Sequence, residues 1–465
     1  MKRVLSFIIA IALVLSALCS MTSCLALVDR LVPDVGGGSG DGDSLDGDGA
    51  GGSTADGSHN SGVSGEVDNP DGGTESDGIT PDGGELPDGG DNYIDDYLPD
   101  SEENASLADK ITDIRKTLLS TVVIISNFTV STAYDETYTH KDSSAGSGVI
   151  YKLDREAGDA IIITNLHVVY DSYSITPNKI SNEIDVYLYG QEYADYKIRA
   201  TYIGGSLTED LAVLRIENSD VLRNSCAREA ELGDSDLVSV FDKVYAVGNP
   251  EGDGMAATEG TVSVESESLS MTGSDGSTAL NLRVIRVSAA INQGNSGGGL
   301  YDESGRLIGI VNAKKVGSEV DNIAWAIPIN LARNIVDNIL DYADGIFKTS
   351  GYRALLGVTV TSGVSGVRVD ADTGRLYKAE TVVISSISET SILNNEDGTS
   401  LLYSGDIINK ITVDGVEREI YRIHHVIDHM YTARVGSTVV VNVTRDGRTF
   451  DVTVEIPEEA LTELK

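Results

Sequence analysis

Short runs of apolar, mostly β-branched residues follow one another from residue 122 to residue 311, and Gly, Asp or Asn residues separate them. Many short strands with turns between them are typical of an all-β barrel or sandwich. We therefore expect an all-β domain in this part of the chain. The predicted strands are Val122–Ser126, Ser147–Tyr151, Ala160–Thr164, Ile184–Tyr189, Ala212–Ile216, Val244–Val247, Val284–Val287 and Leu307–Val311.

Apolar residues at helical spacing predict helices on both sides of these strands. Leu107–Leu119 precedes them, and Ile329–Tyr342 reads as an amphipathic helix that closes the β domain. A second β unit follows, with a helix near Ile420–Tyr431. The strands predicted for this unit are Leu355–Val360, Thr381–Ile387, Ile407–Val413, Thr438–Arg445 and Thr449–Ile456.

The N-terminus has a different pattern, in which a Lys-Arg pair precedes an apolar run over Val4–Leu18. A basic start followed by about 15 apolar residues predicts a signal peptide and is short for a spanning helix. Thr22-Ser23-Cys24 resembles a bacterial lipobox, so we expect a lipoprotein signal peptide over 1–23 and lipid attachment at Cys24. An uncleaved signal anchor and plain secretion are the alternatives. Each of the three places the rest of the chain outside the cytoplasmic membrane.

Acidic residues are concentrated in residues 24–104. The whole chain has 73 acidic and 34 basic side chains, which gives a formal charge of −39. Between Leu25 and Asn104, 21 acidic residues face one arginine, a net charge of −20. This Gly/Asp/Ser-rich stretch has few large apolar residues, so we expect a disordered linker that its own charge extends. The acidity also argues against nucleic-acid binding, which needs a basic surface.

Three cysteines are present, and two of them, Cys19 and Cys24, lie in the N-terminal segment. Cys226 is the one cysteine in the rest of the chain, and a lone cysteine cannot close an internal disulfide. We therefore expect no disulfide framework, and we interpret Cys226 as a structural or incidental thiol.

Three residues of the first β domain are candidates for chemistry. His167 follows a predicted strand, Asp210 precedes another, and Ser296 lies in a glycine-rich turn. The order His, Asp, Ser is one of the known linear arrangements of the serine-protease triad. A serine hydroxyl is a weak nucleophile that needs an adjacent base, and imidazole can take its proton while a carboxylate holds the imidazole. Each residue alone is commonly structural, but the order and spacing together predict a triad.

The three residues lie within longer motifs that occur in the same order in a known protease family. These motifs are Thr164-Asn165-Leu166-His167-Val168, Asp210-Leu211-Ala212-Val213-Leu214, Ala246-Val247-Gly248-Asn249-Pro250, Ala289-Ala290-Ile291-Asn292-Gln293-Gly294-Asn295-Ser296-Gly297-Gly298 and Ala324-Trp325-Ala326-Ile327-Pro328. With them, residues 105–347 resemble the trypsin-like serine proteases of the HtrA (DegP-like) family. The resemblance implies two perpendicular six-stranded β-barrels with the active cleft between them. It implies that His167 is the general base, Asp210 the orienting acid and Ser296 the nucleophile.

The resemblance also implies which groups surround the scissile bond. It assigns the oxyanion hole to the backbone N–H groups of Gly294 and Ser296, together with Asn295. Ala290 lies six residues before the nucleophile, where trypsin-like specificity needs an aspartate, so we expect a preference for small or medium apolar residues. Departures from the family pattern, such as Gln293 in place of proline, leave the shape of the cleft open. The implied pocket residues are Ala290, Ile291, Val311, Asn312 and Ala313.

The second β unit carries motifs of another kind. Leu355-Leu356-Gly357-Val358 resembles a loop whose backbone N–H groups bind a peptide carboxylate, and Gly405–Gly415 resembles the strand and turn that follow it. On these motifs, residues 352–458 resemble the PDZ domain that follows the protease in this family. The resemblance implies peptide binding at Leu355, Leu356, Gly357 and Val358, with the peptide added as a strand against the predicted helix.

Three histidines, His424, His425 and His429, lie in that predicted helix. His425 and His429 are four residues apart, so they can share one helix face. A zinc site is one interpretation, but the surrounding sequence supplies no cysteine or carboxylate ligand set. We interpret these histidines as solvent-facing or groove-lining residues and expect no metal.

The sequence thus predicts an all-β-dominated protein with a disordered linker, a trypsin-like double β-barrel and a PDZ domain. We expect an extracytoplasmic serine endopeptidase that degrades or processes unfolded or misassembled envelope proteins and recognises peptide C-termini. A lipid would tether it to the membrane, its chemistry needs no cofactor, and the family resemblance implies a homotrimer. A catalytically latent chaperone or adaptor led by the PDZ domain is one alternative, and a regulatory protease with one narrow substrate is another.

Overall fold

The computed structural model describes residues 113–132, 135–191, 196–312, 323–343, 351–371, 373–395 and 398–464. These residues belong to one compact unit. The predicted signal peptide, Cys24 and the predicted linker lie outside the described residues. Within the described part of the chain, we find no helix of the length and apolarity that a bilayer crossing requires.

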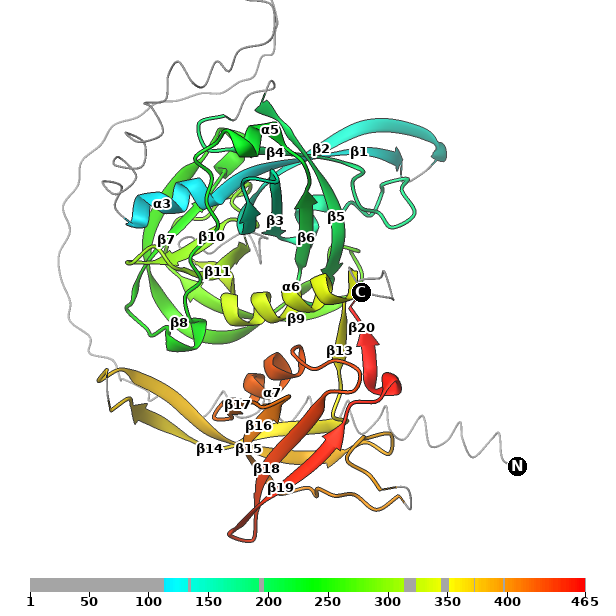
Figure 1. Ribbon diagram of the computed structural model, residues 1–465, viewed down its shortest axis with the longest axis vertical. Coiled ribbons are helices and arrows are strands. Elements are labelled where there is room, and N and C mark those ends of the chain that lie inside the picture. Colours follow the sequence, from blue (N-terminus) through cyan, green and yellow to red (C-terminus); the bar gives the residue numbers. More distant parts are fainter. Residues whose placement is uncertain are drawn as a thin grey trace, which may run out of the picture. The chain divides into compact units, whose positions relative to one another are not determined.

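Two closed β-barrels form the larger part of this unit (Figure 1). Closure pairs every strand on both sides and leaves no exposed sheet edge. The short strands predicted an all-β domain, and the trypsin-like double β-barrel that the family resemblance implied is confirmed. In sheet order, the first barrel is β1 (Thr121–Thr132), β2 (Asp135–Asp154), β3 (Asp159–Thr164), β6 (Leu211–Ile216), β5 (Ile198–Ser206) and β4 (Glu183–Leu188). The second barrel is β10 (Gly299–Asp302), β11 (Leu307–Asn312), β12 (Ala324–Pro328), β9 (Ala279–Val287), β8 (Ala256–Thr272) and β7 (Lys243–Gly248).

Short helices connect these strands. The longest helix of the barrel region, α6, ends one residue beyond the predicted amphipathic helix. The described part of the predicted first helix is α3, and residues 107–112 lie outside the described residues. The helices are α3 (Asp113–Ser120), α4 (Leu166–Val169), α5 (Asp220–Arg223), the 3₁₀ turns η3 (Ser235–Leu237) and η4 (Pro250–Gly252), and α6 (Ile329–Ala343).

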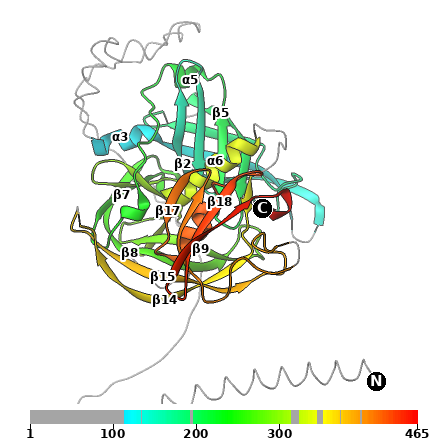
Figure 2. The same ribbon diagram turned by 60° about the horizontal axis from the view of Figure 1, so that its bottom comes forward.

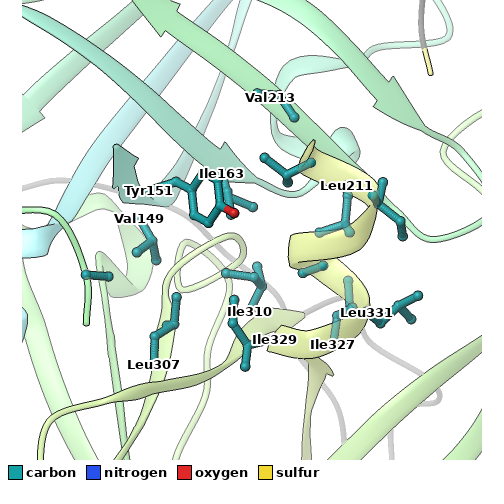
Figure 3. Close-up of a cluster of buried hydrophobic side chains, with 14 of the residues drawn as sticks. Val149, Tyr151, Ile163, Leu211, Val213, Leu307, Ile310, Ile327, Ile329 and Leu331 are labelled. Carbon is teal, nitrogen blue, oxygen red and sulfur yellow. The ribbon is translucent and has the colours of Figure 1, made fainter. Parts of the chain in front are cut away.

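A shared hydrophobic core joins both barrels to α6. Figure 3 shows Leu211 and Val213 of the first barrel, Ile310 of the second, and Leu331 of α6 around one apolar space. Removing such side chains from water contributes about 1.5–3 kcal/mol each. Because the core is continuous, the turns at the ends of β3, β5 and β10 are held against one another.

The C-terminal part is a separate sheet with one helix packed on it. Strand β14 lies at the edge of this sheet, with β15 on one side of it. The sheet order is β14 (Val358–Val369), β15 (Leu376–Ile387), β16 (Ile407–Val413), β18 (Thr438–Arg445) and β19 (Arg448–Glu455), and β17 (Val416–Glu419) pairs with β16. The remaining elements are β13 (Tyr352–Ala354), which pairs with β20 (Leu461–Glu463), the helix α7 (Ile423–Met430) and the 3₁₀ turn η5 (Glu458–Ala460).

The hairpin of β14 and β15 extends well beyond the strands predicted there. Both views show the two strands side by side over their length (Figure 1; Figure 2). Val364 and Val367 in its outer part are exposed. Half-buried strands show apolar alternation because one face is covered, so an uncovered hairpin end lacks the pattern that sequence analysis uses.

The histidines of α7 are not solvent-facing, and the interpretation given to them is wrong. His425 and His429 are 2% and 4% exposed. Val426, Ile427 and Met430 are the residues of this helix that line the neighbouring groove. Side chains about 100° apart on a helix face different neighbours, so the histidines and the groove residues belong to different faces.

Candidate active site

His167 and Asp210 form a direct pair. His167 lies in α4, just after β3, and Asp210 lies in the turn between β5 and β6. Nδ1 of His167 lies 2.6 Å from Oδ2 of Asp210, and the His167 backbone N–H donates to Oδ1 at 3.1 Å. The Asp210 side chain is 2% exposed, whereas the imidazole is 20% exposed. A carboxylate at Nδ1 selects the tautomer in which Nε2 can act as a base.

The turn that carries Asp210 is held on both sides. Its backbone carbonyl accepts hydrogen bonds from the Asn165 side chain at 2.9 Å and from the Leu166 N–H at 3.2 Å. Asp210 itself has a φ of 51°, a left-handed conformation that a non-glycine residue adopts at some cost. The conformation persists because the neighbouring contacts fix it.

Asn312 also holds the Asp210 carboxylate. Its Nδ2 donates to Oδ2 at 2.9 Å, and the residue is 1% exposed. The Ser274 hydroxyl lies 3.5 Å from Oδ1. Asn312, which the resemblance placed in the specificity pocket, therefore contacts the acid of the triad.

The turn before and after Ser296 requires glycine at two positions. Gly294 and Gly297 have φ of 96° and 83°. A Cβ on Gly294 would lie 2.1 Å from the Asn249 carbonyl oxygen, and one on Gly297 would lie 2.2 Å from the Ser147 carbonyl oxygen. Side chains at these positions would both strain the backbone and collide with it. This explains why Ser296 is flanked by glycines.

Ser147 connects this turn to the first barrel. Its hydroxyl donates to the Gly294 carbonyl at 2.8 Å and accepts from the Asn249 N–H at 2.8 Å. Its backbone N–H donates to the Ser296 carbonyl at 2.8 Å. Sequence reasoning missed this residue. The signal was its place between Gly146 and Gly148 inside a strand, because glycine in a strand marks a close approach.

The peptide between Gln293 and Gly294 has a defined orientation. The Gln293 carbonyl accepts from the Glu251 N–H at 2.7 Å. In a planar trans peptide the N–H points opposite to the carbonyl, so the Gly294 N–H points away from Glu251. The Asn295 N–H donates to the Asn292 carbonyl at 3.1 Å and is thereby already used.

One cleft of about 780 Å³ collects the predicted catalytic residues. His167, Gly294 and Ser296 line it, together with Ile291 from the predicted specificity pocket. Of the other pocket residues, Val311 is fully buried and Ala290 is exposed. Ala313 lies outside the described residues. The arrangement places a base, a serine and a turn of backbone amides around one space that can hold an extended peptide.

A second groove of about 590 Å³ lies in the C-terminal part. The four predicted peptide-binding residues, Leu355 to Val358, all line it, and Val426, Ile427 and Met430 of α7 form its other wall. The Leu355 N–H donates to the Ala460 carbonyl at 2.8 Å, so it is already used. The groove lies between edge strand β14 and α7, which is the arrangement in which a peptide can add to a sheet as a further strand.

The structure adds a carboxylate to the histidines considered as a zinc site, but the electrostatic surroundings disfavour a bound cation. Polar atoms of Asp236, His424 and His425 lie within 4.8 Å of one another. The Asp236 carboxylate, however, accepts from Arg418 and, at 3.3 Å, from Arg283. Burial, with nearby Arg418, lowers the pKa of His425 to about 3. Surroundings that disfavour one positive charge also disfavour a dication. We therefore interpret the cluster as uncharged histidines of α7 packed beside Asp236, whose ion pairs are with Arg283 of β9 and Arg418 of β17.

Comparisons with known proteins find similarity to trypsin-like serine proteases. Residues 146–310 match the family model described as "Trypsin-like peptidase domain". "Serine protease Do-like HtrA" of Lactococcus lactis subsp. lactis (strain IL1403) is 31% identical over 322 residues, 68% of this chain and 71% of that protein. "Periplasmic pH-dependent serine endoprotease DegQ" of Escherichia coli (strain K12) is 29% identical over 316 residues, 67% of this chain and 59% of that protein. The solved structure "HtrA-type protease AlgW with decapeptide" aligns at a TM-score of 0.45 and 23% identity, over 74% of this chain and 97% of that one.

Proposed function

The chain belongs to the HtrA family of serine proteases and is a serine endopeptidase, and we propose that His167, Asp210 and Ser296 are its catalytic triad. The observation that carries this proposal is the His167–Asp210 pair, 2.6 Å apart, beside the same cleft that Ser296 lines. Ser143 and Ser144 also line this cleft, but they lie in strand β2, whereas Ser296 lies in the turn between Gly294 and Gly297.

In the proposed mechanism, Nε2 of His167 takes the proton of the Ser296 hydroxyl as its oxygen attacks the scissile carbonyl carbon. The imidazolium that forms is stabilised by the buried Asp210 carboxylate at Nδ1. The same proton then passes to the leaving amine, and the acyl-enzyme remains. Water, activated by the neutral imidazole, hydrolyses the acyl-enzyme and restores the serine.

The oxyanion of each tetrahedral intermediate would be bound by the backbone N–H groups of Gly294 and Ser296. The contact between the Gln293 carbonyl and Glu251 supports this assignment, because it fixes the direction of the Gly294 N–H. Loss of one such donor costs about 2.7–4 kcal/mol of transition-state stabilisation. Asn295 takes no part through its backbone, since its N–H is used within the turn.

We propose that the enzyme prefers small or medium apolar residues at the cleavage site. Ala290 carries no charge to pair with a Lys or Arg substrate side chain. Ile291 presents an apolar side chain to the cleft.

We also propose that the C-terminal part is a PDZ domain that binds peptide C-termini. Its support is the groove between β14 and α7, which all four predicted loop residues line. A peptide would extend the sheet from β14, and its carboxylate would lie near Gly357, whose φ of 72° turns the loop.

We place the enzyme outside the cytoplasmic membrane, tethered through Cys24, where unfolded or misassembled envelope proteins would be its substrates. The signal-peptide pattern supports the location, as does the relative from Escherichia coli that is named as periplasmic. A homotrimer is proposed on family resemblance.

The test is hydrolysis of casein and labelling by a fluorophosphonate. Ser296→Ala should remove labelling and lower casein hydrolysis by about 10⁶-fold, because the nucleophile is lost. Ser304→Ala, which changes an exposed serine away from the cleft, should leave both unchanged. Casein cleavage that persists in Ser296→Ala would refute the triad. A parent that neither labels nor cleaves would support the latent chaperone or adaptor instead.

A further inference from the structure

The side chain that ends α7 is inserted into the core of the barrel region. Tyr431 is 0% exposed and belongs to the same buried cluster as Leu211 and Ile339. The Asn338 side chain of α6 donates to the Tyr431 carbonyl at 2.9 Å. Tyr431 therefore belongs by sequence to the C-terminal part and by packing to the protease core.

The hydroxyl of Tyr431 reaches the residue next to the catalytic acid. It donates to Oε1 of Glu209 at 2.6 Å. The other oxygen, Oε2, accepts from the hydroxyls of Ser206 and Thr208. Burial, followed by the charge of Glu209, raises the pKa of Tyr431 well above 10, so the phenol keeps its proton and remains a donor.

Glu209 thereby clamps the turn that places Asp210. One carboxylate oxygen accepts hydrogen bonds from Ser206 and Thr208 within the same turn. The other oxygen accepts a hydrogen bond from Tyr431. Asp210 follows directly, in a left-handed conformation that the turn must maintain. A change of about 1 Å in the position of a catalytic group can cost about 10²-fold in rate.

We propose that Tyr431 is a positioning residue for the catalytic acid, acting through Glu209 on Asp210. The inference rests on the proposed triad. Its consequence is specific: without the Tyr431 hydroxyl, Asp210 holds the His167 imidazolium less well. The rate of the chemical step then falls, while substrate binding is unchanged.

The experiment measures kcat and KM separately for the full chain and for Tyr431→Phe, with a chromogenic peptide ester as substrate. We expect Tyr431→Phe to lower kcat by about tenfold with KM unchanged, which corresponds to about 1.4 kcal/mol.

The matched control is Tyr301→Phe. Tyr301 is fully buried in the same core cluster, and its hydroxyl lies 2.9 Å from Thr121, away from Glu209. This change should lower thermal stability to a similar extent but leave kcat unchanged. An equal loss of kcat in both variants would mean that the effect comes from general destabilisation of the fold, and it would overturn the proposal.

A double-mutant cycle with Glu209→Ala, which removes the oxygen that accepts from the Tyr431 hydroxyl, completes the test. If Tyr431 acts through Glu209, the double variant should be no slower than Glu209→Ala alone, because the contact that Tyr431→Phe removes is already absent. Additive losses, or normal kinetics in Tyr431→Phe, would overturn the positioning role. In either case intact fluorophosphonate labelling at Ser296 would leave the protease function standing, so the two failures are distinguishable.

Discussion

The side-chain amide of Asn312 contacts Asp210, the proposed catalytic acid. Its donation to Oδ2 of Asp210 is a hydrogen bond to a buried charge, worth about 1.5–3 kcal/mol. Asn312→Ala should therefore lower kcat by about 10- to 100-fold and leave KM nearly unchanged. Steady-state kinetics on a peptide ester measure both.

Asn330→Ala is the control for this change. Asn330 is buried, and its amide donates to the Asp234 carboxylate at 2.7 Å, outside the cleft. The Asn330→Ala variant should have a lower free energy of unfolding but the same kcat as the parent. Equal losses of kcat in the two variants would show that Asn312 acts through the fold and not through Asp210.

At the scale of single residues, sequence analysis predicted the candidate catalytic residues but missed the residues that hold them in place. His167, Asp210 and Ser296 stand in motifs whose residue types follow from the reaction, so order and spacing were enough to propose them. Asn312 and Ser147 act through contacts with residues more than 100 positions away. Such contacts depend on how the barrels close, and no local pattern records them.

At the scale of elements, the turn around Ser296 depends on β2 through Ser147. Ser147→Ala leaves the Gly294 carbonyl and the Asn249 N–H without their partner, and each buried unsatisfied group costs about 1–3 kcal/mol. We expect a lower melting temperature together with at least tenfold slower fluorophosphonate labelling, because the oxyanion turn loosens.

Ser120→Ala separates these two effects. Ser120 is buried and hydrogen-bonds the Thr117 carbonyl at 3.1 Å, within α3 and remote from the cleft. It should destabilise the protein but label at the parent rate once folded. Slow labelling in this variant too would remove the special role given to Ser147.

The C-terminal sheet has its own ionic contact, between Asp406 and Arg445. Two hydrogen bonds of 2.7 and 2.6 Å join the guanidinium to the carboxylate, which is 1% exposed. Burial alone would raise the pKa of Asp406, but the Arg445 contacts and the Tyr403 N–H lower it overall. The folded state thus favours the ionised carboxylate.

Because the folded pKa is depressed, this stabilisation is present above the unfolded pKa of about 3.9 and is lost as pH falls below it. Asp406→Asn should cost about 3–5 kcal/mol at pH 7, since it leaves Arg445 without its charged partner. Urea unfolding at pH 7 and pH 3 should show the difference between parent and variant shrinking at pH 3. A constant difference would contradict the ionic origin.

Element positions followed from sequence where one face of a strand or helix is buried. β16 and β18 have the bounds predicted for them, and α6 differs by one residue at its end. The prediction fell short at the exposed end of the β14–β15 hairpin and at α7, where His425 is buried beside Asp236 of η3 and His429 is buried beside Val416 of β17. The end of the hairpin faces solvent, and α7 packs against residues that are distant in the sequence. Neither surrounding can be read from the local pattern of residues.

At the scale of the whole molecule, a short series of contacts links the C-terminal groove to the cleft that contains His167 and Ser296. Arg353 lines the C-terminal groove, and its guanidinium donates to the Tyr431 hydroxyl at 3.4 Å. Tyr431 in turn holds Glu209, beside Asp210. A peptide packed against Val426 and Met430 would order the last turn of α7, so Tyr431 would hold Glu209 more firmly.

Occupancy of the C-terminal groove should therefore accelerate the chemistry at Ser296. We expect an octapeptide that ends in three valines with a free carboxylate to raise the rate of fluorophosphonate labelling about fivefold or more. The same peptide with an amidated C-terminus should bind weakly and have no effect. The Tyr431→Phe variant should bind the peptide with the free carboxylate with the same Kd as the parent, as measured by fluorescence anisotropy. Its rate of fluorophosphonate labelling, however, should be the same with and without this peptide. Equal acceleration in Tyr431→Phe would mean that the groove reaches the active site by another route, because the only contact removed is the one to Glu209 and Arg353.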